Sequence, residues 1–202
     1  MAAPSSPAGN PAGRWLRHPL LLGAGCLIAA LAAAAVVGSQ SHRLAAMFLA
    51  ACGVLLCFAD IASHRLPNRL MVITGAGITV LLAAASWWDD HWSALARGVL
   101  AAVVLGATFL VLAVLRPTGL GMGDVKLGAV LGLWLGWLSW PSVLLGVALA
   151  FVGGGLWSMT LLAMRRVQRD SHIAFGPWLL VGAAVATVVH ERAPQALLAL
   201  PW

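Results

Sequence analysis

Residues 94–115 read ALARGVLAAVVLGATFLVLAVL, and this stretch decides the fold class. Arg97 is the only charged residue in it. An α-helix rises 1.5 Å per residue, so a helix of this length extends about 33 Å and can cross the hydrocarbon core of a bilayer. The stretch therefore predicts a transmembrane helix.

Six more apolar runs of similar character flank this one along the chain. Hydrophobic residues make up 61% of the sequence and charged residues only 9%, which excludes an ordinary soluble domain. We predict an all-α, polytopic membrane bundle of about seven helices, within a range of six to eight. The run at 126–140 is short, and we expect Trp134, Trp137 and Trp140 to anchor it at the membrane interface. The six runs are 19–38, 43–59, 69–88, 126–140, 142–164 and 176–190.

One transmembrane domain over residues 19–190 accounts for nearly the whole chain, because the gaps between runs are too short for a second fold. Residues 1–18 are rich in Pro, Ala, Ser and Gly and are expected to form a mobile tail. Residues 191–202 are expected to form a short tail on the other side. The first run could be a cleaved signal peptide, but its length favours a retained helix.

Positive charge predicts the orientation of the chain. With the N-terminus in the cytoplasm and the C-terminus outside, nine Lys and Arg residues lie inside and three lie outside. The net charge of +6 is therefore explained by topology, and no nucleic-acid partner is expected. The inside residues are Arg14, Arg17, Arg65, Arg69, Arg116, Lys126, Arg165, Arg166 and Arg169, and the outside ones are Arg43, Arg97 and Arg192.

Two carboxylates stand beside apolar runs on the predicted cytoplasmic side. Asp60 follows the second run, and Asp124 opens the fifth helix after the sequence Gly-Leu-Gly-Met-Gly. Ionisable groups near membrane depth are costly and often functional. A close pair of carboxylates can share a proton and divide the roles of general base and general acid. The alternative is that each aspartate only caps a helix.

Other kinds of site have little support in the sequence. The three cysteines lie inside apolar runs without a C-x-x-C spacing, and the six histidines are scattered, so neither a metal site nor a cofactor is expected. Gly132 and Gly136, with the run Gly153-Gly154-Gly155, are interpreted as positions of close helix packing.

Three segments together resemble the type IV prepilin peptidases, particularly the short forms of Tad/Flp pilus systems. They are Asp60 followed by Leu66-Pro67-Asn68, then Gly121-Met122-Gly123-Asp124-Val125-Lys126-Leu127, and then Ile173-Ala174-Phe175-Gly176-Pro177-Trp178. The second segment contains the G-x-G-D motif of aspartyl membrane proteases. In the third, Ala174 stands where the family usually has Pro.

The resemblance implies that Asp60 and Asp124 are the catalytic aspartates. It further implies a multi-pass protein of the bacterial cytoplasmic membrane, whose substrates are prepilins or pseudopilins with a leader and an apolar helix. Longer relatives carry a cysteine-paired segment linked to N-methylation, so only peptidase activity is expected here. The rival interpretations are a small proton- or ion-coupled transporter and a non-catalytic pilus assembly protein. The remaining site residues implied are Gly121, Gly123, Lys126, Pro67, Asn68, Gly176 and Pro177.

Overall fold

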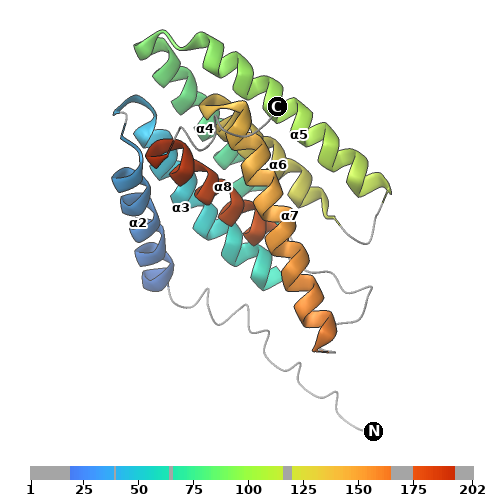
Figure 1. Ribbon diagram of the computed structural model, residues 1–202. Coiled ribbons are helices and arrows are strands. Elements are labelled where there is room, and N and C mark those ends of the chain that lie inside the picture. Colours follow the sequence, from blue (N-terminus) through green and yellow to red (C-terminus); the bar gives the residue numbers. More distant parts are fainter. Residues whose placement is uncertain (1–18, 39, 64–65, 116–119, 165–174, 194–202) are drawn as a thin grey trace, which may run out of the picture.

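A bundle of α-helices makes up the protein (Figure 1). The computed structural model describes residues 19–38, 40–63, 66–115, 120–164 and 175–193. Every regular element in these ranges is an α-helix, as expected for the all-α class. The helices are α2 (Pro19–Val36), α3 (Gln40–Ser63), α4 (Asn68–Asp89), α5 (Trp92–Leu115), α6 (Met122–Leu138), α7 (Trp140–Ala163) and α8 (Gly176–Arg192).

Four of these helices are long and apolar enough to cross a membrane by themselves. The corresponding spans are Ser41–Ile61, Asn68–Asp89, Trp92–Leu115 and Trp140–Thr160. Their outward faces carry large apolar side chains such as Val80, Val103 and Leu156, each more than 60% exposed. Such a surface is stable only in contact with lipid. The predicted class of helical membrane bundle is therefore confirmed.

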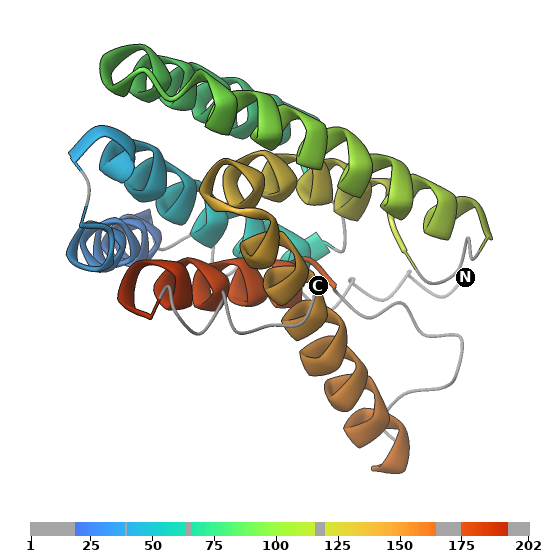
Figure 2. The same cartoon turned by 45° about the horizontal axis from the view of Figure 1, so that its top comes forward.

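Helix α6 lies at the centre, with α5 along one side and α8 along another (Figures 1 and 2). Every residue from Leu131 to Leu138 is buried. A helix that is apolar on all sides can be enclosed by neighbours in this way. At the edge of the bundle α2 packs along α3, while the last turns of α7, beyond the contact of Trp157 with Trp178 on α8, extend away from the other helices.

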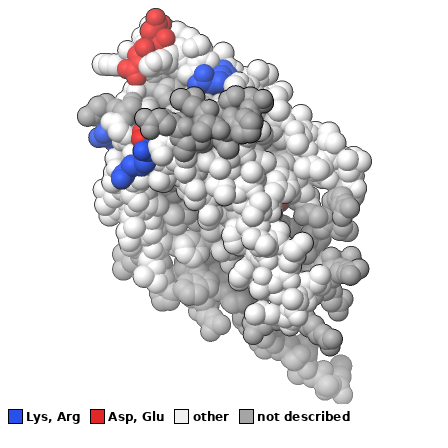
Figure 3. Space-filling view, in the orientation of Figure 1, with Lys and Arg blue, Asp and Glu red and all other residues white. Residues whose placement is uncertain are grey.

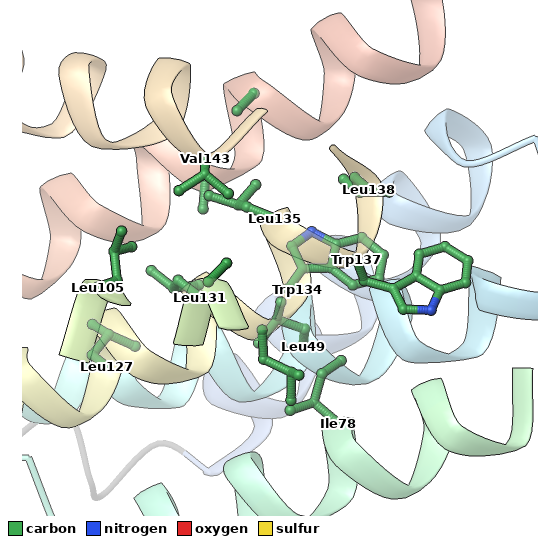
Figure 4. Packing of buried hydrophobic residues seen from close by; sticks show 14 of the residues in the cluster. Leu49, Ile78, Leu105, Leu127, Leu131, Trp134, Leu135, Trp137, Leu138 and Val143 are labelled. Carbon is green, nitrogen blue, oxygen red and sulfur yellow. The ribbon is translucent and has the colours of Figure 1, made fainter. Parts of the chain in front are cut away.

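Two of the three tryptophans assigned to the membrane interface lie instead in the core, so that prediction was wrong for them. Trp134 is 2% exposed and Trp137 is 7% exposed, and both pack among leucines of the central cluster (Figure 4). Each indole N–H has a partner, since Trp134 donates to Thr187 at 2.9 Å and Trp137 donates to Ser86 at 3.1 Å. These buried acceptors offset the cost of burying the polar edge of each indole.

Exposed tryptophans occur elsewhere, at the turn between α4 and α5. Trp87 is 76% exposed, Trp88 is 86% exposed and Trp92 is 46% exposed. Asp90 reverses the chain there in the left-handed region, at φ 55°. This turn has the amphipathic aromatic side chains that favour a membrane–water interface.

Small residues allow the central helices to approach closely, as the glycine pattern predicted. A Cβ on Gly132 would lie 2.8 Å from the carbonyl oxygen of Ala101 on α5. A Cβ on Gly136 would meet Ala101 itself, and one on Gly182 of α8 would meet the carbonyl oxygen of Gly146 on α7. Of the Gly153–Gly155 run, the first two face aromatic side chains of α8 and its start, while Gly155 faces open space.

The boundary between α6 and α7 differs from the predicted break at Trp140-Pro141. Only Ser139 separates the helices, and Pro141 lies in the first turn of α7. Proline is well tolerated there because its missing N–H has no intrahelical partner anyway.

The structure also explains why the run of α5 contains one charged residue, Arg97. Its guanidinium donates to the last carbonyl oxygens of α6, at 2.7 Å to Gly136 and 2.7 Å to Trp137.

A group of polar residues links α2, α3 and α8 near the C-terminal ends of α2 and α8. Glu191 accepts a hydrogen bond from the Gly38 N–H at 3.1 Å and pairs with His42 Nε2 at 3.1 Å. His42 packs against the Trp137 ring, with 4.6 Å between centroids. Arg43 donates to the carbonyl oxygens of Val37 and Gly38. We call Gly38, His42, Arg43 and Glu191 the His42–Glu191 cluster.

Charged side chains on the visible face gather at one end of the molecule, and a wide uncharged surface separates them from the opposite end (Figure 3). This distribution suits a bilayer-embedded middle. Most of the predicted inside charges, the predicted tail at 1–18 and residues 194–202 lie outside the described residues, so the orientation of the chain stays a prediction. Helix α8 includes Glu191 and Arg192 and so extends two residues into the predicted tail at 191–202.

Candidate active site

Asp60 lies in the last turn of α3, and its side chain is buried against the start of α8. The residue is only 6% exposed. Its Oδ2 accepts a hydrogen bond from the Gly176 N–H at 3.1 Å. A carboxylate is poorly placed at the C-terminus of its own helix, but the first N–H groups of α8 favour it. Helix α3 runs past the predicted boundary to Ser63, which places Asp60 inside the helix instead of after it.

Asp124 is the third residue of α6 and is also buried, at 8% exposed. Its Oδ2 accepts a hydrogen bond from the Gly121 N–H at 3.1 Å. Gly121 is the N-cap, so this is the half of a capping box that the third residue supplies. The helix begins at Met122, four residues before the predicted apolar run, because this loop-side turn is stabilised by the aspartate and not by apolar packing.

The two buried carboxylates come together at one end of the bundle. Burial opposes ionisation of the Asp124 carboxyl, and the nearby negative charge of Asp60 opposes it further. The two residues are 64 positions apart in the chain and lie at the end of α3 and the start of α6. Burying two like charges beside each other costs stability, so such an arrangement is typical of functional sites.

Gly176 is shaped by its contact with Asp60. A Cβ at Gly176 would lie 2.6 Å from Asp60 Oδ2, closer than any side chain tolerates. Pro177 follows in the first turn of α8, where its fixed φ suits a helix start. Phe175, just before, packs on α7 with its ring centroid 5.2 Å from that of Phe151. Gly176 thus combines a donor for Asp60 with space for its carboxylate.

The remaining motif residues lie around the starts of α4 and α6. Pro67 is the N-cap of α4 and adopts an extended backbone. Lys126 Nζ donates to Asn68 Oδ1 at 2.6 Å, which links α6 to α4. Lys126 is exposed, and its hydrogen-bond partner is Asn68 and neither aspartate. A Cβ on Gly123 would lie 2.9 Å from the Leu66 side chain.

Leu66 and Phe175 belong to the quoted family segments but were not predicted as site residues, and the structure places both against this end of the bundle. Leu66 limits the space beside Gly123, and Phe175 carries the chain into α8 beside Asp60. Among the described residues, no group of three His, Cys, Asp or Glu side chains could hold a metal ion.

Comparison with known proteins gives the family. The model of the "Type IV leader peptidase family" matches residues 47–159, which include both aspartates. The chain belongs to this family. Together with its apolar helices, membership makes it a multi-pass protein of the inner membrane.

Curated relatives agree with this placement, and several are named prepilin leader peptidase/N-methyltransferase. The one from Burkholderia pseudomallei is 32% identical, over 83% of this chain and 53% of its own length. The one from Escherichia coli is 34% identical, over 83% of this chain and 71% of its own. The chain thus spans about half the length of the first relative. No solved structure matches the chain.

Proposed function

We propose that this protein is an aspartic-type endopeptidase that removes leader peptides from type IV prepilins or pseudopilins. The observation that carries the proposal is the pair of buried, mutually repelling carboxylates of Asp60 and Asp124. Family membership supports a prepilin peptidase, since the relatives carry that name. The pairing of two aspartates supports the aspartic type.

The proposed reaction is hydrolysis by a carboxylate pair that shares one proton. The ionised carboxylate takes a proton from a water molecule, whose oxygen attacks the scissile carbonyl carbon. The protonated carboxyl donates a hydrogen bond to the carbonyl oxygen and so stabilises the charge that develops there. The proton removed from water is then delivered to the amide nitrogen, and the C–N bond breaks. Asp60 and Asp124 can exchange these roles, and we assign neither to one residue.

The glycines beside the carboxylates support access for an extended peptide. Gly121 is exposed at the N-cap of α6, whereas Leu66 packs closely against Gly123, so the approach to the carboxylates is on the Gly121 side. A peptide backbone can approach such a loop closely because no side chain intervenes. The main-chain hydrogen bonds from Gly121 and Gly176 hold one oxygen of each carboxylate in place.

We further propose that this end of the bundle faces the cytoplasm, with the N-terminus inside and the C-terminus outside. In the predicted topology Arg69, Lys126 and seven other Lys and Arg residues fall on the side of the candidate site, whereas Arg43, Arg97 and Arg192 fall on the opposite side together with Asp89, Asp90 and Glu191. Excess positive charge on one side is typical of cytoplasmic loops. The substrate's leader would then be cut on the side where the pilin precursor is made.

Within the substrate class, we propose Tad/Flp-like prepilins and cleavage without N-methylation. The short-form resemblance supports the pilin type. The three cysteines support the absence of methylation, because Cys26, Cys52 and Cys57 lie within α2 and α3 and not in a paired loop. The relatives are named for both activities, so methylation is a separate question from cleavage.

The test is cleavage in a defined system. Purified protein in liposomes is mixed with a full-length Tad/Flp-like prepilin, with and without S-adenosylmethionine, and the products are analysed by gel and mass spectrometry. We expect loss of the leader and an unmodified new N-terminus in both conditions. Intact prepilin would contradict the peptidase proposal. It is the result that the transporter and pilus assembly interpretations predict. A mass increase of one methyl group only when the donor is present would contradict the proposal of cleavage without methylation.

A further inference from the structure

An open apolar groove runs between α2, α3 and α8, with a volume of about 400 Å³. These helices lie side by side in both ribbon views (Figures 1 and 2). Small side chains line its walls, including Ala32 on α2, Ala50 on α3 and Ala184 on α8. Ala32 and Ala184 are exposed, so the groove opens sideways, toward the lipid in a membrane.

One end of this groove reaches the candidate active site. Cys57 lines the groove and lies one helical turn before Asp60 on α3. Pro177 also lines it and directly follows Gly176, the residue that donates to Asp60. From Cys57 the groove follows α3 back to Ala46, about 16 Å at 1.5 Å per residue. It is therefore a track of about three helical turns that starts beside the carboxylates.

The groove walls select for an occupant that needs no hydrogen bonds from them. Thr187 is the hydroxyl residue of the lining, and its Oγ1 is already engaged with Trp134 Nε1 and the Ala183 carbonyl oxygen. In lipid, a peptide satisfies its own backbone only as a helix. Alanine-rich walls allow such a helix to approach closely. The lining thus fits an apolar helix with small or medium side chains.

The attachment of α2 leaves the groove able to widen near the active site. Side-chain hydrogen bonds that join α2 and Gly38 to α3 and α8 are concentrated at the far end, through the His42–Glu191 cluster and Arg192 to Ala35, and a further one joins Cys26 Sγ, near the middle of α2, to the Ala51 carbonyl oxygen at 3.4 Å. Toward the start of α2, a Cβ on Gly25 would meet Val54 in ordinary contact, and a Cβ on Gly23 would have nothing within 4 Å. Helix α2 is thus tied most firmly at the end away from Asp60.

We infer that this groove seats the apolar N-terminal helix of the substrate, with the helix start beside Asp60 and Asp124. The inference rests on the proposed function, in which the bond that is cut immediately precedes that helix. A helix that begins at the carboxylates must leave along a path that starts there, and the groove is such a path. Helix α2 forms its movable wall. A lipid acyl chain is the competing occupant and is an outcome of the test.

Disulfide trapping tests this placement. Cys26, Cys52 and Cys57 are replaced by Ala, Asp124→Asn is added to retain uncut substrate, and Ala184→Cys supplies the probe. Single cysteines are then scanned along the first three turns of a full-length prepilin helix in native membranes. Because a disulfide requires Cα atoms within about 7 Å, trapping should recur every three to four positions. The matched control is Ala148→Cys, an exposed alanine on α7 outside the groove.

Periodic trapping at position 184 and little at position 148 would support the inference. Equal trapping at both positions, or none at 184, would overturn it and leave a lipid as the occupant. Cleavage by the parent protein is measured in the same membranes, so failure of the proposed function would be seen separately as intact prepilin.

A kinetic arm gives a second readout. The double variant Ala32→Leu/Ala184→Leu narrows the groove from both walls and should raise KM for full-length prepilin about tenfold, since overfilled packing is costly. The double variant Ala107→Leu/Ala148→Leu adds the same side chains on exposed positions outside the groove and should stay near the parent KM. An unchanged KM in the groove variant would overturn the inference.

Discussion

The two polar ends of the bundle are built on opposite principles. In the His42–Glu191 cluster, a carboxylate faces an imidazole at 3.1 Å and also accepts a main-chain N–H, while the other ring nitrogen, His42 Nδ1, is buried without a hydrogen-bond partner among the described residues. At the other end, two carboxylates, Asp60 and Asp124, are buried near each other, and each accepts a main-chain N–H from a helix start. Groups of opposite charge that pair with each other can stabilise a fold. Like charges placed together lower its stability and are typical of functional sites. The comparison predicts which end tolerates substitution without loss of activity.

The largest expected effect comes from the aspartates. Asn is as good a helix-capping acceptor as Asp, so Asp60→Asn and Asp124→Asn should preserve the hydrogen bonds to Gly176 and Gly121. Neither variant can move a proton, so each should lower prepilin cleavage by at least about 10³-fold, and the double variant should be no worse. Cleavage is followed on gels, and folding by thermal unfolding in detergent.

The control for this test is Asp89→Asn, which alters a carboxylate at the other end of α4 and should leave cleavage unchanged. If the aspartates serve only as helix caps, both Asn variants will fold and process prepilin at the parent rate. That result would show that the aspartate end of the bundle, like the His42–Glu191 cluster, has only a structural role.

Gly176→Ala should have the next largest effect. Its Cβ would lie 2.6 Å from Asp60 Oδ2, so the carboxylate must move while keeping its charge. A misplacement of this order can cost about 10²-fold in rate, which should appear in kcat more than in KM. Steady-state kinetics with purified prepilin measures the change.

Gly155→Ala is the matched control, because a Cβ there meets nothing within 4 Å. Alanine is also a better helix former than glycine in a helix interior. It should unfold at the same temperature or slightly higher and cleave at the parent rate. Equal kcat values for the two variants would show that the close approach of Gly176 to Asp60 has no role in the reaction.

The sequence predicted the helices well but not which of their faces are buried. Uniform apolar runs fix length, and Arg and Lys indicate sides, which was sufficient to expect Asp60 and Asp124 at one end. Runs such as that of α6 carry no amphipathic pattern to separate a lipid face from a core face, so Trp134 and Trp137 were placed wrongly. The contact of Gly176 with Asp60 joins residues 116 positions apart, and only the packing of α8 on α3 creates it.

At the other end of the bundle, Glu191→Ala should lower stability and leave chemistry intact. The change removes the partner of His42 Nε2, which is buried, and that of the exposed Gly38 N–H, which water can replace, and should cost about 2 kcal/mol because the buried ring nitrogen loses its partner. A fall in Tm of about 5 °C is expected in detergent. Asp90→Asn, which removes an exposed carboxylate and keeps a residue type that tolerates the positive φ of this position, is the control. Lost cleavage at unchanged Tm would contradict a purely structural role for this cluster.

The smallest effect is expected at the contact of Lys126 with Asn68, which decides whether the lysine acts on structure or on the aspartates. The contact is exposed, so removing it with Lys126→Met should lower cleavage only about threefold. If the lysine acts through Asn68, the variant Asn68→Ala alone should produce the same decrease in cleavage. The double variant should then show no further decrease, because the effects of residues in contact are not additive.

If Lys126 instead influences the carboxylate pair directly, the decrease from Lys126→Met will persist in full when Asn68 is already Ala. Cleavage rates of the four proteins, measured over a range of salt concentrations, complete the cycle. A direct electrostatic effect on the pair weakens as salt is added, whereas a positional effect through Asn68 should depend little on it.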